Sequence, residues 1–113
     1  MNPTGHHPRL SLDPLIHRPI TLSVTAALSS VDEADFATVR DIVQVSDSVL
    51  SKQITSLEEA GYLKVRKGFV GRRSRTYLSL TAQGRAALAA HLKALWQIAG
   101  DATGGPADSP APE

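Results

Sequence analysis

Apolar residues recur at three- and four-residue steps in several stretches of the chain, and this spacing predicts amphipathic helices. The first such stretch contains Leu12, Leu15 and Ile16. Asp13 and Pro14 occupy positions typical of a helix N-cap and of a first helical residue. An opening helix is therefore expected here.

Two more helices are expected before position 45. Pro19–Ser29 carries apolar residues on one face, and a proline at its first position favours a helix start. A polar, acidic connection follows over residues 30–35. Phe36 is expected to form a minimal strand before a short helix over residues 37–44.

The helix expected over residues 46–60 has the clearest boundaries. Ser46 is a good N-cap, and Gly61 is a natural C-terminal stop. Asp47 favours the positive end of the helix dipole and is expected to cap the helix or to contact a base donor. Since little more than Val45 separates this helix from the one before, the two are expected to cross steeply, as in a helix-turn-helix.

The two faces of this helix differ in character. Leu50, Ile54 and Leu57 share one face and are expected to anchor the core. The other face carries short hydroxyl side chains and a lysine, the composition with which a recognition helix reaches base edges in the major groove of DNA. Its members are Ser48, Ser51, Lys52 and Thr55, with Glu59 toward the end of the helix.

After Gly61 the apolar pattern becomes typical of strands. Residues 62–65 and 77–80 flank a Gly-containing, Arg-rich loop over residues 68–73, which predicts a hairpin. Thr81 is expected to cap a last helix that ends near Ala99. The expected fold class is therefore α+β and mainly helical, with four helices, two strands and a final helix in that order.

Length and composition are those of one globular domain. The chain has 113 residues, of which 42% are hydrophobic and 20% charged, enough for one core but too few for two. Residues 1–9 and 100–113 are rich in Pro, Gly and polar residues and are expected to be disordered, which leaves residues 10–99 as the domain. With no signal peptide and no apolar run near the roughly 18 residues of a membrane span, a cytoplasmic location is expected.

Several kinds of chemistry have no support in the sequence. The chain has no cysteine, which excludes disulfides, thiol redox sensing and thiolate metal sites. It also lacks a phosphate-cradling glycine loop, a cluster of metal ligands and a recognisable serine–base arrangement, and His17 and His91 stand alone in the sequence. Catalytic residues, a cofactor and a metal are therefore not expected.

The net charge of +1 conceals an uneven distribution. Residues 31–41 contain four acidic residues against one arginine, whereas residues 60–100 contain many lysines and arginines and no Asp or Glu. Such a basic segment is the electrostatic footprint of a face that binds a polyanion. The apolar Phe69 and Val70 lie at the tip of the basic hairpin and are expected to pack back against its base, in preference to contacting a DNA sugar.

Three segments of the chain resemble the winged-helix regulators of the MarR/ArsR-like kind, particularly their short single-domain members. They are DIVQVSDSVLSKQITSLEEAGYL (residues 41–63), KVRKGFVGRRSRTYLSL (64–80) and LTAQGRAAL (80–88), preceded by LDPLIHRPITLSVTAAL, which resembles the family's opening helices. Gln44 departs from the pattern, because the family usually has glycine at that turn position. The long dimerisation arms and the Cys-based metal sensors of larger relatives are absent.

The resemblance implies a sequence-specific regulator of transcription that binds double-stranded DNA. Residues 46–60 would enter the major groove, and the basic wing over residues 64–80 would contact the backbone or the minor groove. A winged-helix module that binds protein instead of DNA is the alternative, and the basic wing argues against it. The expected DNA contacts are Ser46, Ser48, Ser51, Lys52, Thr55, Lys67, Arg72, Arg73 and Arg75.

A homodimer is also expected. A last helix of about 19 residues is roughly 28 Å long, more than one small core needs, and Trp96 lies near its far end. A small-molecule effector between the first and last helices is a further possibility, although no polar constellation identifies a ligand. The expected dimer interface consists of Leu12, Leu15, Ile16, Leu88, Leu92, Leu95 and Trp96.

Overall fold

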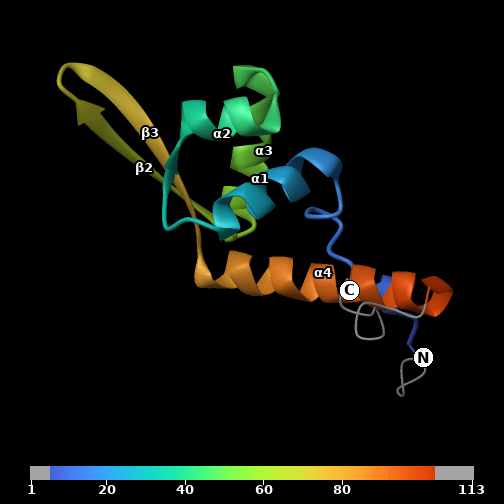
Figure 1. Cartoon of the computed structure of the whole chain (residues 1–113). Coiled ribbons are helices and arrows are strands. Elements are labelled where there is room, and N and C mark those ends of the chain that lie inside the picture. The colour runs from blue at the N-terminus through green and yellow to red at the C-terminus, as the bar shows by residue number, and fades with distance from the viewer. Residues whose placement is uncertain (1–5, 104–113) are drawn as a thin grey trace, which may run out of the picture.

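The computed structural model describes residues 6–103 and shows a mainly helical α+β fold with a winged-helix arrangement (Figure 1). This confirms the predicted fold class. Among these residues, no helix is both long and apolar enough to cross a membrane. In chain order the elements are η1 (a 3-10 helix, Pro8–Ser11), α1 (Pro19–Ser29), β1 (Ala34–Asp35), α2 (Phe36–Val43), α3 (Asp47–Glu59), β2 (Leu63–Val70), β3 (Arg73–Leu80) and α4 (Ala82–Thr103).

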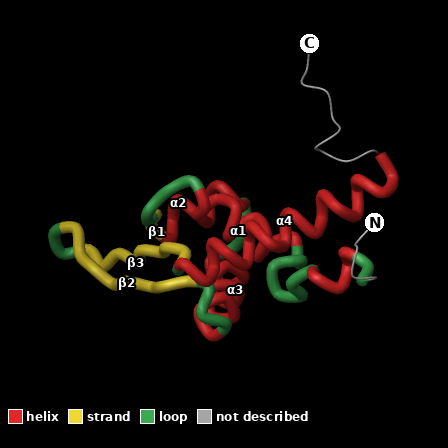
Figure 2. Tube along the Cα trace, turned by 90° about the horizontal axis from the view of Figure 1, so that it is seen from below, coloured by secondary structure: helices red, strands yellow, loops and turns green. Residues whose placement is uncertain are grey.

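The helices α1, α2 and α3 form a body from which two elements project. The hairpin of β2 and β3 extends from one end, and the last turns of α4 extend from the other (Figures 1 and 2). The short β1 completes an antiparallel sheet in the order β1-β3-β2. The wing and the far end of α4 are therefore well separated.

One apolar core holds the body together, and α3 contributes the face that the sequence predicts. Leu50, Ile54 and Leu57 are buried, as expected. They pack with apolar side chains from the helices before them and from both long strands. These partners are Val24, Leu28, Val39, Leu63, Leu78 and Leu80.

The wing is longer and its turn tighter than the sequence pattern indicates. The strands continue through residues 68–70 and Arg73, so that only Gly71 and Arg72 form the turn. Gly71 has a φ of 63°, which glycine adopts readily and which a two-residue hairpin turn requires at its first position. The minimal strand is also shifted: β1 ends at Asp35, and Phe36 already belongs to α2.

The prediction of a helix around residues 12–16 is wrong. A 3-10 turn precedes it at Pro8–Ser11, and Asp13 then folds the following residues into a turn by accepting hydrogen bonds from the backbone N–H groups of Leu15 and Ile16. Pro19 disfavours a helical conformation for the residue before it, which limits the space for a helix. The expected disorder over residues 1–9 stays a prediction: η1 includes residues 8 and 9, and residues 1–5 lie outside the described residues.

Polar contacts fasten this opening segment to the rest of the chain. The Tyr62 hydroxyl donates to Asp13 Oδ2 (2.6 Å), and the Asp13 backbone N–H donates to Nδ1 of the fully buried His91 (3.0 Å). Nε2 of His91 lies 3.4 Å from Nδ1 of His17. The two histidines that stand alone in the sequence therefore belong to one structural network.

The helix α4 begins in direct contact with Gly61 and Tyr62, which follow α3. Thr81 caps α4 as predicted, since its hydroxyl accepts from the Gly84 N–H (2.9 Å) and donates to the Gly61 carbonyl (2.7 Å). A Cβ at Gly84 would overlap the backbone carbonyl of Tyr62, so only glycine allows this approach. At its other end α4 continues to Thr103, beyond the predicted end near Ala99, and residues 104–113 lie outside the described part.

Candidate nucleic-acid interface

The joint between α2 and α3 has the geometry of a helix-turn-helix. Gln44 adopts a left-handed conformation (φ 61°), and Ser46 caps α3 by accepting a hydrogen bond from the Val49 N–H (3.2 Å). Asp47 does not cap the helix, because Ser46 does, and it forms an ion pair with Arg40 on α2 (2.9 Å). This pair links the two helices across the turn, and a contact of Asp47 with a base stays a prediction.

The outer face of α3 is exposed and polar. Ser48, Ser51, Lys52 and Thr55 are all exposed, as predicted. The Thr55 hydroxyl donates to the Ser51 carbonyl (3.0 Å). The side chain of Lys52 has no hydrogen-bond or ion-pair partner among residues 6–103, where only its backbone carbonyl accepts, from the Ser56 hydroxyl (3.3 Å). Its ammonium group is therefore available to a ligand.

At the base of the wing, arginines are held by acidic residues that lie far away in the sequence. Arg66 binds Glu33 in two hydrogen bonds and stacks on the Tyr77 ring, with its guanidinium carbon 4.2 Å from the ring centroid. Arg75 lies 3.7 Å from Asp35. Because of these pairs, part of the wing's positive charge is already neutralised.

Asp35 is ionised at neutral pH. Its pKa is lowered from the usual value mainly because the Thr38 hydroxyl donates to the carboxylate, with a smaller contribution from the charge of Arg75. Sequence reasoning missed both acidic partners of the wing, although it had identified residues 30–35 as an acidic connection. The antiparallel pairing of β1 with β3 is what brings this connection to the wing.

The wing tip remains cationic and carries exposed apolar side chains. Lys67, Arg72 and Arg73 form no ion pair within the described part of the chain. Phe69 is 75% exposed and Val70 is 52% exposed, so the prediction that they pack against the hairpin base is wrong. The extended strands carry both side chains beyond the reach of the core.

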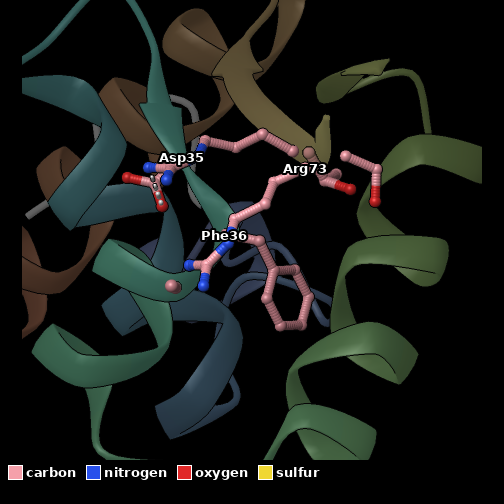
Figure 3. A pocket seen from close by; sticks show the side chains of 7 residues that line it. Asp35, Phe36 and Arg73 are labelled. Atoms are coloured by element: carbon pink, nitrogen blue, oxygen red, sulfur yellow. Dashed lines mark ion pairs between the residues drawn. The ribbon is translucent and has the colours of Figure 1, made fainter. Parts of the chain in front are cut away.

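A shallow cavity of about 310 Å³ lies between β3 and the start of α2. Figure 3 shows Asp35 and Phe36 on one side of this cavity and Arg73 on the other, with the ion pair of Asp35 drawn as a dashed line. The cavity therefore lies under the wing, beside the helix-turn-helix. Within residues 6–103, no three His, Asp or Glu side chains gather into a group that could hold a metal ion.

The residues expected at a dimer interface separate into two groups. Ile16 and Leu88 are buried inside this chain, so they support its own packing and offer no interface area. Trp96 is 56% exposed and Leu92 is 38% exposed, and both lie on α4, one helical turn apart. Leu12, Leu15 and Leu95 are partly buried.

The short joint, the capped and outward-facing α3 and the two-stranded wing together define a winged helix-turn-helix protein. The chain belongs to the winged helix DNA-binding domain family, whose profile matches residues 20–99. No curated protein matches the sequence significantly.

Solved structures of bacterial and archaeal regulators share the fold. A transcriptional regulator homologue from Pyrococcus horikoshii OT3 is 22% identical, with a TM-score of 0.73 over 78% of this chain and 87% of that one. The PcaV transcriptional regulator from Streptomyces coelicolor, in complex with its natural ligand, is 20% identical, with a TM-score of 0.69 over 85% and 67%. A MarR-family regulator from Silicibacter pomeroyi is 22% identical, with a TM-score of 0.61 over 92% and 68%.

Proposed function

We propose that this protein is a transcription regulator that recognises a specific sequence in double-stranded DNA. The observation that carries the proposal is an exposed polar face on α3, with an unpaired Lys52, beside a wing tip whose cations Lys67, Arg72 and Arg73 have no acidic partner in the described chain. A helix of this kind fits the major groove, and a basic hairpin beside it fits the backbone or the minor groove. Membership of the winged helix DNA-binding domain family supports the same function.

The residues of α3 have distinct roles in this proposal. Lys52 reaches a guanine edge or a phosphate, and Ser48 and Ser51 donate to or accept from bases. Ser46 contributes mainly by capping the helix, since its oxygen already accepts from the Val49 N–H. Thr55 retains an acceptor oxygen after its hydroxyl has donated to Ser51.

The wing supplies contacts that do not depend on sequence. Lys67, Arg72 and Arg73 neutralise phosphates or enter a narrow minor groove, where the negative potential is strongest. Arg75 has a different role, because its ion pair with Asp35 holds β3 against β1. We therefore assign Arg75 to positioning the wing instead of to direct contact.

We also propose that the protein acts as a homodimer through the exposed side of α4 that carries Leu92 and Trp96. An exposed tryptophan beside an exposed leucine is typical of an interface anchor, and Trp96 and Leu92 have this arrangement. A two-fold dimer can place two recognition helices about 34 Å apart, which is the spacing of successive major grooves on one side of DNA.

A small-molecule effector stays a prediction for this chain. One structural relative, BpsR from Bordetella bronchiseptica, has its DNA binding regulated by 6-hydroxynicotinic acid. The cavity described above lies beneath the wing and not between the opening segment and α4. It therefore gives no support to an effector at the predicted place.

The decisive experiment compares variants on two kinds of DNA. Duplexes bound by the protein are first selected from the source genome, and affinity is then measured on a selected duplex and on a random one. Lys52→Ala and Ser48→Ala should each cost about 1 to 3 kcal/mol on the selected duplex and less on the random one, because base contacts carry the specificity. Lys93→Ala removes the same charge from α4 and should leave both affinities unchanged.

Two results contradict this proposal in different ways. If the wild type binds no duplex even at low salt, the chain is a protein-interaction module, since contact with phosphates alone gives measurable binding. If the wild type binds but both α3 variants match it on both duplexes, α3 does not lie in the interface.

A further inference from the structure

The most exposed large apolar side chain in the described part of the molecule lies at the wing tip. Phe69 is 75% exposed, more than Leu10, Ile42 or Trp96. Its neighbour Val70 is 52% exposed. Neither residue packs on another element, so the fold itself gains little from an aromatic ring at this position.

The strand register places the ring on the face of the wing that enters the core at the hairpin base, but beyond the reach of that core. Phe69 pairs with Ser74 across the hairpin, and cross-strand partners share a face, here with the buried pair Leu63 and Leu80. Lys67, two positions earlier, lies on this face too. Arg73 and Arg75 belong to the opposite face, on which Arg75 reaches Asp35 of β1.

The tip is also narrow. The turn contains only Gly71 and Arg72, and no atom lies within 4 Å of the place where a Cβ of Gly71 would be. Gly68, just before the ring, contributes no side chain either. A tip of this shape fits the minor groove of B-DNA, which is about 6 Å wide.

Charge and polarity together identify the surface that this tip matches. Cations without an ion pair in the described chain, Lys67, Arg72 and Arg73, lie within four residues of Phe69, and no acidic residue lies within the hairpin sequence. A partner must therefore be anionic on its outside and apolar just beneath. The minor groove has this arrangement, because phosphates line its rims while sugars and base edges form its floor.

We propose that Phe69 is an apolar wedge that enters the minor groove and partly separates two stacked base pairs, so that binding depends on how easily the DNA deforms. This inference rests on the proposed function. Apolar side chains inserted between base steps kink the duplex, and pyrimidine–purine steps such as TA yield most easily. Phe69 thus adds a preference for deformable DNA at a position where no hydrogen bond reads the base.

The test keeps the α3 site of a selected duplex and changes only the step beneath the wing. One duplex carries TA there, and the other carries AA within a stiff A-tract. Affinity is measured by fluorescence anisotropy, and bending is measured by energy transfer between dyes at the duplex ends. The wild type should bind the TA duplex about five- to tenfold more tightly, because a TA step unstacks more easily than a step within an A-tract, and should bend it more.

Three variants separate the wedge from other effects. Phe69→Ala should lose the preference for TA and the extra bend, while keeping the wild-type affinity for the A-tract duplex and the wild-type thermal stability. Phe69→Leu should retain part of the preference, since leucine also acts as a wedge. Val70→Ala is the matched control on the opposite face and should behave as the wild type.

The proposal is overturned if Phe69→Ala keeps the preference for TA, or if the wild type binds both duplexes equally and bends neither. These failures leave the proposed function intact, because DNA binding itself is still observed in them. Failure of the proposed function looks different: the wild type then binds no duplex at all.

Discussion

Arg66 on β2 and Glu33 in the connection after α1 are joined by two parallel hydrogen bonds, of 3.0 Å from Nε and 2.8 Å from Nη2. The hydrogen bond from Arg66 is the main cause of the lowered pKa of the Glu33 carboxyl and, in return, of the raised pKa of the guanidinium. Both groups therefore remain charged and compensate each other. The number of basic residues in the wing overstates the charge that it can offer to DNA.

This difference between paired and unpaired arginines predicts different salt dependence. Each phosphate contact contributes about 0.9 to the slope of log K against log salt concentration. Removing the unpaired Arg72 and Arg73 together by alanine substitution should flatten the slope by roughly one to two. Arg66→Ala should lower affinity by loosening the wing but leave the slope nearly unchanged. Titrations of one duplex at several salt concentrations measure the slope for each variant. An equal change of slope for Arg66→Ala would contradict the conclusion that Arg66 is neutralised by Glu33.

Substitutions at the exposed apolar residues of α4 test the proposed homodimer. Replacing Trp96 and Leu92 together by alanine should convert a dimer into a monomer at tens of micromolar protein, because it removes the exposed apolar anchor. Sedimentation equilibrium measures the mass of each species. Ile42→Ala, which truncates an exposed apolar side chain on α2, is the control and should remain dimeric. A monomeric wild type would eliminate the dimer.

The buried His91 predicts a loss of stability in mild acid. Its pKa is lowered from the usual value mainly by burial, with a further contribution from the nearby His17, while the charge of Asp13 opposes the shift. Near pH 6.5 the unfolded chain therefore takes up a proton that the folded chain does not, and the free energy of unfolding falls as the pH decreases below this point. For one proton the slope cannot exceed about 1.4 kcal/mol per pH unit.

Denaturant unfolding at a series of pH values measures this effect. His91→Asn keeps an acceptor for the Asp13 N–H but does not titrate, so its stability should vary less than that of the wild type between pH 5 and 6.5. Asp13 acts in a separate, more acidic range. Burial raises its pKa, but hydrogen bonds from Tyr62, Ile16 and Leu15 outweigh this and lower it, so its contribution is lost as the pH falls through the folded-state pKa. An unchanged pH profile in His91→Asn would show that another group is responsible.

The left-handed turn residue offers a gain in stability. Gln44 has a φ of 61°, a conformation that costs a residue with a Cβ about 1 to 2 kcal/mol. Gln44→Gly removes this cost but adds freedom to the unfolded chain, so a net stabilisation of about 0.5 to 1 kcal/mol is expected. Gln44→Ala keeps the cost and should not stabilise. Thermal and denaturant unfolding of both variants decide the point, and a destabilised glycine variant would show that the Gln44 side chain itself supports the turn.

The elements that the sequence predicted well are those with local signals at both ends. The predicted bounds of α1 are those observed, and α3 differs by one residue at each end, because a proline start, a serine cap and a glycine stop act within a few residues. The Schellman bonds around Gly61 illustrate this local control: Gly61 N–H donates to the Glu58 carbonyl and Tyr62 N–H to the Leu57 carbonyl.

The prediction of an opening helix was wrong because the local signals there are weak. Its helical spacing covers only a few residues, too few to sustain a helix without help from packing. The side chain of Asp13 offers the backbone an alternative set of hydrogen bonds, and these stabilise a turn. Residues of this type compete with helices as well as cap them, and spacing alone does not distinguish the two.

The charged residues of the candidate interface show the same limit. Exposure of Lys52 and its neighbours followed from the helical period of α3. The pairing of Arg75 with Asp35 did not, because it depends on the two-residue strand β1, which leaves almost no pattern in the sequence. Contacts between distant segments require the register of the sheet, and the register becomes visible only in three dimensions.

The absence of a side chain at Gly84 has a consequence for signalling along the molecule. The first turn of α4 lies against the backbone of Tyr62, three residues beyond the end of α3, and no side chain at Gly84 separates them. We therefore expect a tilt of α4 to move the backbone segment that joins α3 to β2. In the homodimer proposed above, the angle at which two α4 helices cross near Trp96 sets the distance between the two DNA-reading surfaces. A molecule that changes this angle changes the fit to successive major grooves without touching α3 or the wing.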